Sequence, residues 1–231
     1  MLNFLAITLF LLINVAAYQL SKRPLSFSRT CLRILCWVLL VGNLLRYAVI
    51  YPAVYHIVKI PVEFSTVAYF AVPVILLADW KRMKSWAAYS GLMAGFFYYL
   101  AMMLAGETIY GADSLVNTFI SLFCHGTLYL CGLVMISTER CPEEKPTKFL
   151  LCVGYVALRA AVLRPLIANG SHYLIYILLD AIPVRLVFPK QVWPTILPIY
   201  YVLVALFVLF TVSRFFRRSE ERYRKFTALR A

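Results

Sequence analysis

Residues 114–137 read SLVNTFISLFCHGTLYLCGLVMIS, a stretch with one histidine, His125, and no Asp, Glu, Lys or Arg. A helix needs about 20 mainly apolar residues to cross the hydrocarbon core of a bilayer. This stretch therefore predicts a transmembrane helix with polar side chains inside the membrane. The number of similar stretches in the chain then decides the fold.

The composition of the whole chain is typical of a membrane protein. Of its 231 residues, 63% are hydrophobic and 14% are charged, and the mean hydropathy is +0.80. Soluble domains are about half apolar and a quarter charged. These values exclude a soluble enzyme, a disordered protein and a fibrous protein. We expect an all-α fold, a polytopic bundle of membrane helices packed as one domain.

Seven stretches are long and apolar enough to span the membrane, and one weaker stretch, Ser171–Phe188, is interrupted by polar residues. We expect seven transmembrane helices and a partial insertion at 171–188, because irregular backbone is tolerated in a bilayer where protein or water covers it. The expected spans are Met1–Leu20, Ile34–Ile57, Ile60–Ala78, Ser85–Leu104, Ser114–Ser137, Phe149–Ile167 and Val192–Phe215.

The distribution of basic residues favours seven spans over eight. The connections 21–33, 79–84 and 138–148 and the tail from Arg214 hold most of the 23 Lys and Arg residues. With seven spans all four segments lie on one side of the membrane, which the positive-inside rule identifies as cytoplasmic. This predicts an outside N-terminus, a transmembrane domain over 1–213 and a basic cytoplasmic tail over 214–231.

The charge and the cysteines limit the partners. The net charge of +13 lies in short segments next to apolar stretches, which suits contact with anionic membrane lipid rather than with nucleic acid. The six cysteines show no CxxC pair and no Cys/His ligand spacing, so neither a metal site nor another cofactor is expected. The sequence does not indicate an oligomeric state.

Polar residues inside the spans mark candidate sites, because they are costly in lipid. His125 could act as a general base. Ser65 and Thr66 lie about one turn into the third span, and a hydroxyl beside an imidazole is the minimal nucleophile–base pair. Tyr129, one turn after His125, could donate to an oxyanion. The alternative is that these groups only make hydrogen bonds between helices.

Four further residues are candidates for substrate binding. Arg46 or Arg159 could hold a phosphate headgroup through a bidentate guanidinium. A stabilising ion pair between one of these arginines and Glu63 is the favoured alternative. Asp180 could orient the histidine, although the sequence does not show that the two meet.

The order of these motifs resembles that of the YwaF-like family of integral membrane proteins. Residues 60–65, IPVEFS, stand where the family has a Leu-Pro-Leu-His-Leu-Cys string, and His125-Gly126 stands where it has His-Gly. Residues 169–173 and Trp193-Pro194 resemble its Asn-Tyr and Trp-Pro region. The similarity covers residues 40–213. It departs from the pattern where the family's Cys is Ser65 and its His is Glu63.

The resemblance implies a lipid substrate. The family is related to transmembrane acyltransferases of ether phospholipids and, remotely, to androgen-induced-gene-type hydrolases of fatty acid esters. It therefore implies that Ser65 is the nucleophile and His125 the base, acting on a phospholipid or fatty acyl ester. We expect an intramembrane lipid acyl hydrolase or acyltransferase. The alternatives are a small-molecule or proton-coupled transporter and a non-catalytic membrane scaffold protein.

Overall fold

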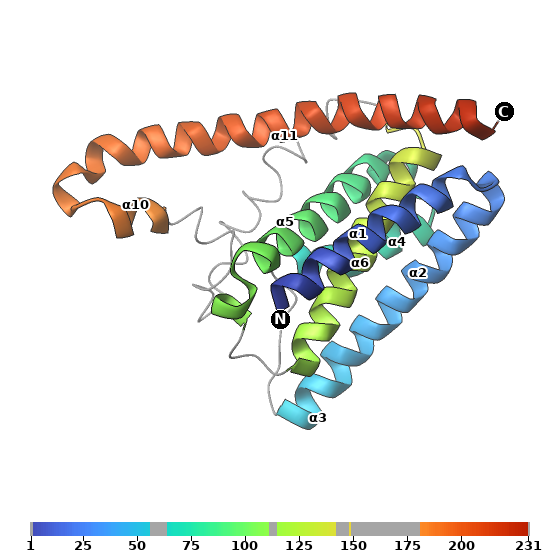
Figure 1. Ribbon diagram of the computed structural model, residues 1–231, viewed down its shortest axis with the longest axis horizontal. Helices are drawn as coiled ribbons and strands as arrows, with labels where there is room; N and C mark the ends of the chain where they lie inside the picture. The colour runs from blue at the N-terminus through green and yellow to red at the C-terminus, as the bar shows by residue number, and fades with distance from the viewer. Residues whose placement is uncertain (1, 56–63, 111–114, 142–147, 149–180, 231) are drawn as a thin grey trace.

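The computed structural model is built from helices. It describes residues 2–55, 64–110, 115–141, 148 and 181–230, and within these ranges it contains no strand. Five helices form a bundle, with α11 lying across one end of it (Figure 1). The bundle helices are α1 (Leu2–Lys22), α2 (Leu25–Leu45), α4 (Phe64–Leu77), α5 (Lys84–Tyr110) and α6 (Leu115–Thr138).

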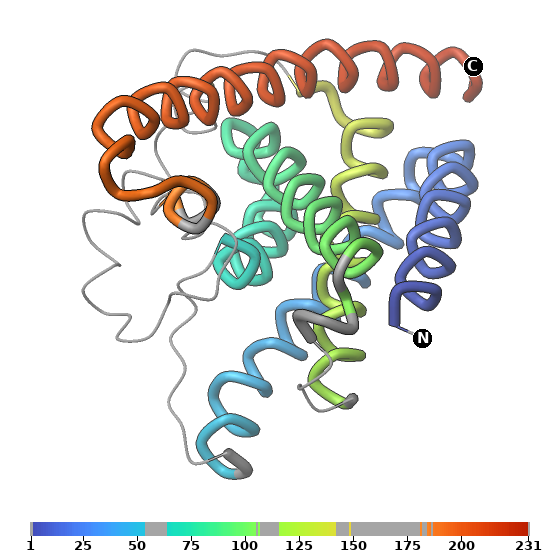
Figure 2. The backbone as a smooth tube through the Cα atoms, turned by 60° about the vertical axis from the view of Figure 1, so that its left-hand side comes forward, coloured from blue at the N-terminus to red at the C-terminus, as the bar shows by residue number. Residues whose placement is uncertain are grey.

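The remaining elements extend this bundle. A π-helix, Arg46–Ile50, and the short α3, Tyr51–Tyr55, continue α2 without a break. A short α10, Ile182–Val187, and a 3-10 turn, Lys190–Val192, precede the long α11, Trp193–Arg230. Figure 2 shows α11 passing over the same end of the bundle from a second direction.

Close contact between α5 and α6 depends on glycine. A Cβ at Gly91 would lie 2.8 Å from the Leu128 carbonyl oxygen, and a Cβ at Gly95 would overlap the Tyr129 Cβ. Gly132 of α6 approaches α5 from the other side, because a Cβ there would lie 2.9 Å from the Leu92 nitrogen. Small residues let helix backbones approach closely where water supplies no driving force. The glycines thus hold α6, with His125, against α5.

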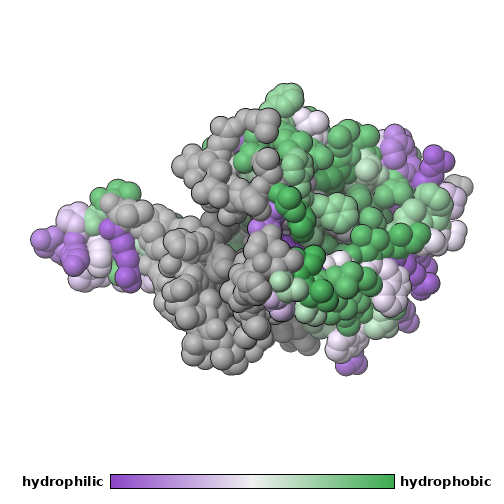
Figure 3. Space-filling model, turned by 90° about the horizontal axis from the view of Figure 1, so that it is seen from below, coloured by the Kyte–Doolittle hydropathy of each residue, from purple (hydrophilic) through white to green (hydrophobic). Residues whose placement is uncertain are grey.

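Five described helices are long and apolar enough to cross a membrane: Leu2–Lys22, Leu25–Ala53, Lys81–Leu104, Val116–Thr138 and Lys190–Arg230. Large apolar side chains such as Leu11, Trp37 and Phe123 point outward from the bundle. Hydrophobic surface covers much of the bundle face in Figure 3, with hydrophilic side chains at its edge. These features support an integral membrane protein. The predicted span 149–167, and residues 171–180 of the partial segment, lie outside the described residues.

Two predicted helix ends differ from the structure. The second helix begins at Leu25 rather than Ile34, because Pro24 starts it and the Ser28 hydroxyl donates to the Leu20 carbonyl oxygen at 2.6 Å, closing a tight turn after α1. The last helix continues past Phe215 to Arg230, so the predicted tail is the second half of α11.

The basic segments share one end of the bundle. Glu139, after α6, accepts from Arg29 of α2 at 2.9 Å and from Lys84 of α5 at 3.1 Å. Lys84 also pairs with Asp79 at 2.7 Å. Arg140 pairs with Glu220 of α11 at 3.4 Å. We call this region the charged end. It joins the three predicted basic connections and the predicted tail.

Candidate functional site

His125 lies in the bundle interior, between α4 and α5. Its ring is buried and stacks on the Tyr98 ring, with centroids 3.7 Å apart and planes 7° apart. The Tyr69 ring meets it edge-on at 5.3 Å. Because α6 presses against α5 through the glycines, the imidazole is enclosed by aromatic rings and held in one orientation.

Hydrogen bonds occupy both ring nitrogens of His125. Nδ1 lies 2.8 Å from the Ser121 carbonyl oxygen, and the Tyr69 hydroxyl lies 2.8 Å from Nδ1 and 3.1 Å from Nε2. A carbonyl oxygen only accepts, so Nδ1 carries the hydrogen and donates to Ser121. In this tautomer Nε2 accepts from the Tyr69 hydroxyl. A general base needs an unprotonated nitrogen facing a hydroxyl, and Nε2 meets this condition in the assigned tautomer.

Ser65 and Thr66 lie on the first turn of α4. Ser65 is half-buried and lies four residues before Tyr69, on the same helix face, whereas the buried Thr66 is turned about 100° away from it. The hydrogen bonds of His125 go to Tyr69 and Ser121 rather than to Ser65 or Thr66. The structure thus places Ser65 one helical turn from the hydroxyl that contacts the base.

Arg46 lies at the start of the π-helix and points inward. It is only 9% exposed, and its guanidinium lies close enough to Cys124 and His125 to interact electrostatically with both side chains. Its central carbon lies 5.2 Å from the Tyr51 ring centroid. The Cys124 thiol lies 3.6 Å from the Asn43 amide nitrogen, so Cys124 faces α2 while His125 faces α4 and α5.

Tyr129 faces away from the imidazole. Its ring stacks on Phe10 of α1 at 5.2 Å, and its hydroxyl lies 3.5 Å from Asn14 Oδ1. The structure therefore does not bring this hydroxyl to His125. Three other predicted site residues, Glu63, Arg159 and Asp180, lie outside the described residues.

Three residues of this site were missed by sequence reasoning. The candidate residues predicted from the sequence include neither Tyr69 nor Tyr98, nor Asn43. Helical spacing could have indicated two of them, because residues three or four apart lie on the same helix face. Tyr69 is four residues after Ser65, and Asn43 is three residues before Arg46. In the described part of the chain, no group of three His, Cys, Asp or Glu side chains could hold a metal ion.

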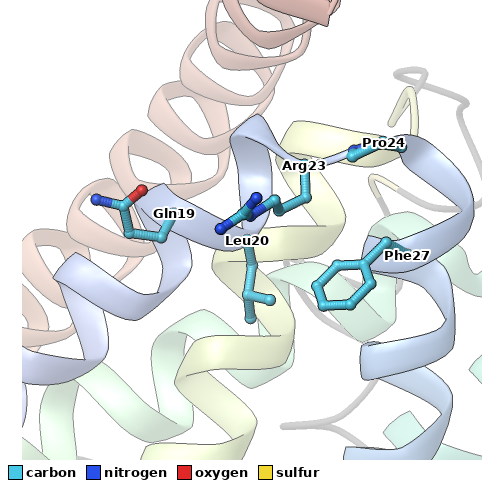
Figure 4. Close-up of a pocket in the computed structure, with 5 residues that line it drawn as sticks. All are labelled: Gln19, Leu20, Arg23, Pro24 and Phe27. Atoms are coloured by element: carbon cyan, nitrogen blue, oxygen red, sulfur yellow. The ribbon is translucent and has the colours of Figure 1, made fainter.

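A recess of about 560 Å³ lies elsewhere, at the turn between α1 and α2. Figure 4 shows Arg23 and Phe27 around it, with Leu20 from the end of α1. It opens at the charged end, and Gln19 and Pro24 complete its lining. It shares no residue with the polar interior around His125.

Comparison of the chain with protein-family models, with curated proteins and with solved structures finds no match. The resemblance to the YwaF-like family thus stays a hypothesis based on the quoted motifs. What the interior can do chemically is argued from its own geometry.

Proposed function

We propose that the protein is a multi-pass membrane protein with seven spans, an outside N-terminus and a cytoplasmic C-terminus. Five described helices are suitable membrane spans, and residues from all four basic segments meet at the charged end. Lys and Arg concentrate on the cytoplasmic side of membrane proteins. In sealed cells, an impermeant reagent should therefore fail to reach a cysteine introduced at Lys81; labelling from outside would overturn this orientation.

We propose further that the interior hydrolyses or transfers acyl groups from lipid esters, with His125 as the base. The observation that carries this proposal is the hydroxyl of Tyr69 lying 3.1 Å from Nε2 of His125 inside a stack of buried aromatic rings. The Ser121 carbonyl oxygen and the Tyr98 ring fix the tautomer and the ring plane. Positioned imidazoles of this kind activate hydroxyl nucleophiles.

Ser65 is the proposed nucleophile. Ser65 lies one helical turn before Tyr69 on the same face of α4, and the proposed reaction requires it to approach Nε2 of His125 after the phenol moves aside. Its Oγ attacks the ester carbonyl carbon as its proton passes to Nε2 of His125; the carbon–oxygen bond to the alcohol then breaks, and the leaving oxygen takes that proton. Water or a second alcohol releases the acyl group by the same route. Thr66 is the second candidate for the attacking hydroxyl.

A fluorophosphonate lipid probe tests this proposal on the purified protein in detergent. Wild type and Thr66→Ala should be labelled, Ser65→Ala should not, and His125→Gln should be labelled at least about tenfold more slowly. Tyr69→Phe should remain labelled, because the phenol occupies Nε2 only in the resting state. Equal labelling of wild type, Ser65→Ala and Thr66→Ala would overturn the nucleophile assignment.

A transporter is the second candidate, favoured by the buried cation of Arg46 beside His125. Buried ionisable groups in membrane bundles often line substrate or proton pathways. Uptake into proteoliposomes that follows a pH gradient, together with no probe labelling at all, would decide for transport. Absence of both would leave the scaffold hypothesis, in which the polar residues only join helices.

A further inference from the structure

The Arg46 side chain combines deep burial with a change in helix geometry. The regular α2 ladder ends at Leu45, and the next five residues form a π-helix that begins at Arg46. Single π-turns within longer helices frequently occur at functional sites. Here the irregular turn places a guanidinium, nine-tenths buried, against the middle of α6.

Among the side chains that the structure describes, no carboxylate pairs with this guanidinium. The carboxylates whose side chains the structure describes, Asp79, Glu139, Glu220 and Glu221, make their ion pairs at the charged end or on the outer face of α11. Arg46 instead lies near Cys124 and His125 of α6 and over the Tyr51 ring.

Burying the Arg46 guanidinium without a counter-ion is unfavourable in free energy. Arginine stays protonated in proteins, and a buried charge is costly unless it is paired. A cation–π contact such as that with Tyr51 returns only part of that cost. The neighbouring Asn43 amide does not compensate the charge either, because its only acceptor is the uncharged Oδ1, which lies 3.9 Å from the Cys124 thiol. A planar fork of N–H donors is thus buried without a negative partner among the described side chains.

We propose that Arg46 binds the anionic group of an amphiphile, a carboxylate or a phosphate that enters with its acyl chain from the membrane. Guanidinium binds both groups through two parallel hydrogen bonds. The inference rests on the proposed function in one respect, that this anion is the polar end of the acyl substrate held next to His125. Binding itself does not require catalysis, so it can be measured separately.

The test uses the full chain in detergent, with thermal unfolding as the readout. Oleate and dioleoyl phosphatidic acid are the two anionic probes, methyl oleate is the uncharged control, and inorganic phosphate separates a lipid headgroup from a free anion. A ligand that binds only the folded state raises the Tm. We expect a rise of about 3 °C or more with an anionic lipid and none with methyl oleate or free phosphate. The probe that acts identifies the group as carboxylate or phosphate.

The variants assign the effect to Arg46. Arg46→Gln should abolish the Tm rise, Arg46→Lys should keep part of it, and Arg33→Gln should leave it intact, because Arg33 is exposed on the same helix. If Arg46→Gln does not fold, the ratio of oleate affinities in Arg46→Lys and wild type decides, and an unchanged affinity overturns the proposal. An equal rise in Arg46→Gln, or no rise with either anion in wild type, also overturns it.

Two further outcomes separate this inference from its alternatives. If Glu63→Gln and Arg46→Gln destabilise the protein equally and their double variant adds nothing, the counter-ion is internal and the anion site is wrong. If fluorophosphonate labelling fails while oleate binding still depends on Arg46, the proposed function fails and the anion site stands. If fluorophosphonate labelling succeeds but oleate binding does not depend on Arg46, the anion site fails and the proposed function stands.

Discussion

The guanidinium of Arg230 donates to the Ser137 carbonyl oxygen at 2.7 Å, joining the last turn of α11 to the last turn of α6. The same side chain donates to the Ser21 carbonyl oxygen of α1 at 3.0 Å. Carbonyls in the last turn of a helix lack partners in their own helix and lie at its negative end. Arg222 adds a third bond, to the Ser137 hydroxyl at 2.6 Å. The tail of α11 therefore caps two bundle helices.

Arg230→Gln should release this cap. The two carbonyl bonds are lost, so we expect about 1–2 kcal/mol less stability and faster amide hydrogen exchange in the last turns of α1 and α11. Arg224→Gln is the matched control, because Arg224 is exposed and pairs with Glu220 on its own helix. Equal effects of the two substitutions would show that the cap contributes nothing specific.

Gly95→Ala should separate α5 from α6. Its new Cβ would overlap Tyr129 and lie 2.7 Å from the His125 carbonyl oxygen, so the backbones must move apart. We expect a loss of about 2–3 kcal/mol in thermal unfolding in detergent. At Gly42 a Cβ meets nothing within 4 Å, and Gly42→Ala should be neutral or stabilising by up to about 1 kcal/mol.

Tyr69→Phe tests the hydrogen bond to the imidazole. Removing the hydroxyl leaves Nε2 of His125 without a donor in the bundle interior, which should cost about 1–3 kcal/mol. The effect should disappear in a His125→Gln background, because the partner is already gone. A double-mutant cycle with no coupling between the two positions would contradict the hydrogen bond between Tyr69 and His125.

Glu139→Gln should loosen the charged end. Glu139 is largely buried and bridges Arg29 of α2 and Lys84 of α5, so its loss removes a link between helices. We expect a loss of about 1–2 kcal/mol, reduced at high salt. Glu221→Gln provides the comparison, since Glu221 is exposed and its partners among the described residues, Arg217 and Arg218, lie on α11 itself; it should cost less than about 0.5 kcal/mol.

The substitution Asp79→Asn tests how the stability of the protein depends on pH. A hydrogen bond from Lys84 holds the pKa of Asp79 below its ordinary value, so the unfolded chain binds a proton more readily than the folded one. The stabilisation is fully present above the unfolded-state pKa, near 4, and is lost as pH falls through the folded-state value. Wild type should therefore melt above Asp79→Asn at pH 7, and the difference should shrink below about pH 4.

Asparagine suits this comparison because Asp79 has a φ of 51°. Asn tolerates that left-handed conformation, so the substitution removes the charge without adding backbone strain. A Tm difference that does not change between pH 7 and pH 3 would show that the carboxylate makes no electrostatic contribution to folding.

Much of the helical organisation could be predicted from hydropathy, because a bilayer requires long apolar helices. The fifth predicted span, 114–137, agrees with α6 to within one residue at each end. The predicted start of the second span, Ile34, was wrong, because α2 begins at Leu25. Arg29 and Arg33 interrupt the apolar pattern, but they lie in the turns of α2 nearest the charged end, where basic residues are tolerated.

The candidate site was less predictable than the spans. The polar face of α6 and the burial of His125 and Arg46 followed from the cost of polar groups in lipid. The partner of the imidazole did not, because the sequence cannot specify which face of α4 meets α6. In the structure this partner is Tyr69, one turn beyond Ser65 and 56 positions from His125 in the chain.

The unbroken course of α11 has a mechanical consequence. At 1.5 Å per residue, its 38 residues form a rod about 57 Å long, nearly twice the hydrocarbon thickness of a bilayer. A rod of that length magnifies rotation: tilting the whole helix by about 5° about Trp193 would displace Arg230 by about 5 Å. A small tilt of α11 is therefore enough to break the hydrogen bonds from Arg230 to the Ser21 and Ser137 carbonyl oxygens.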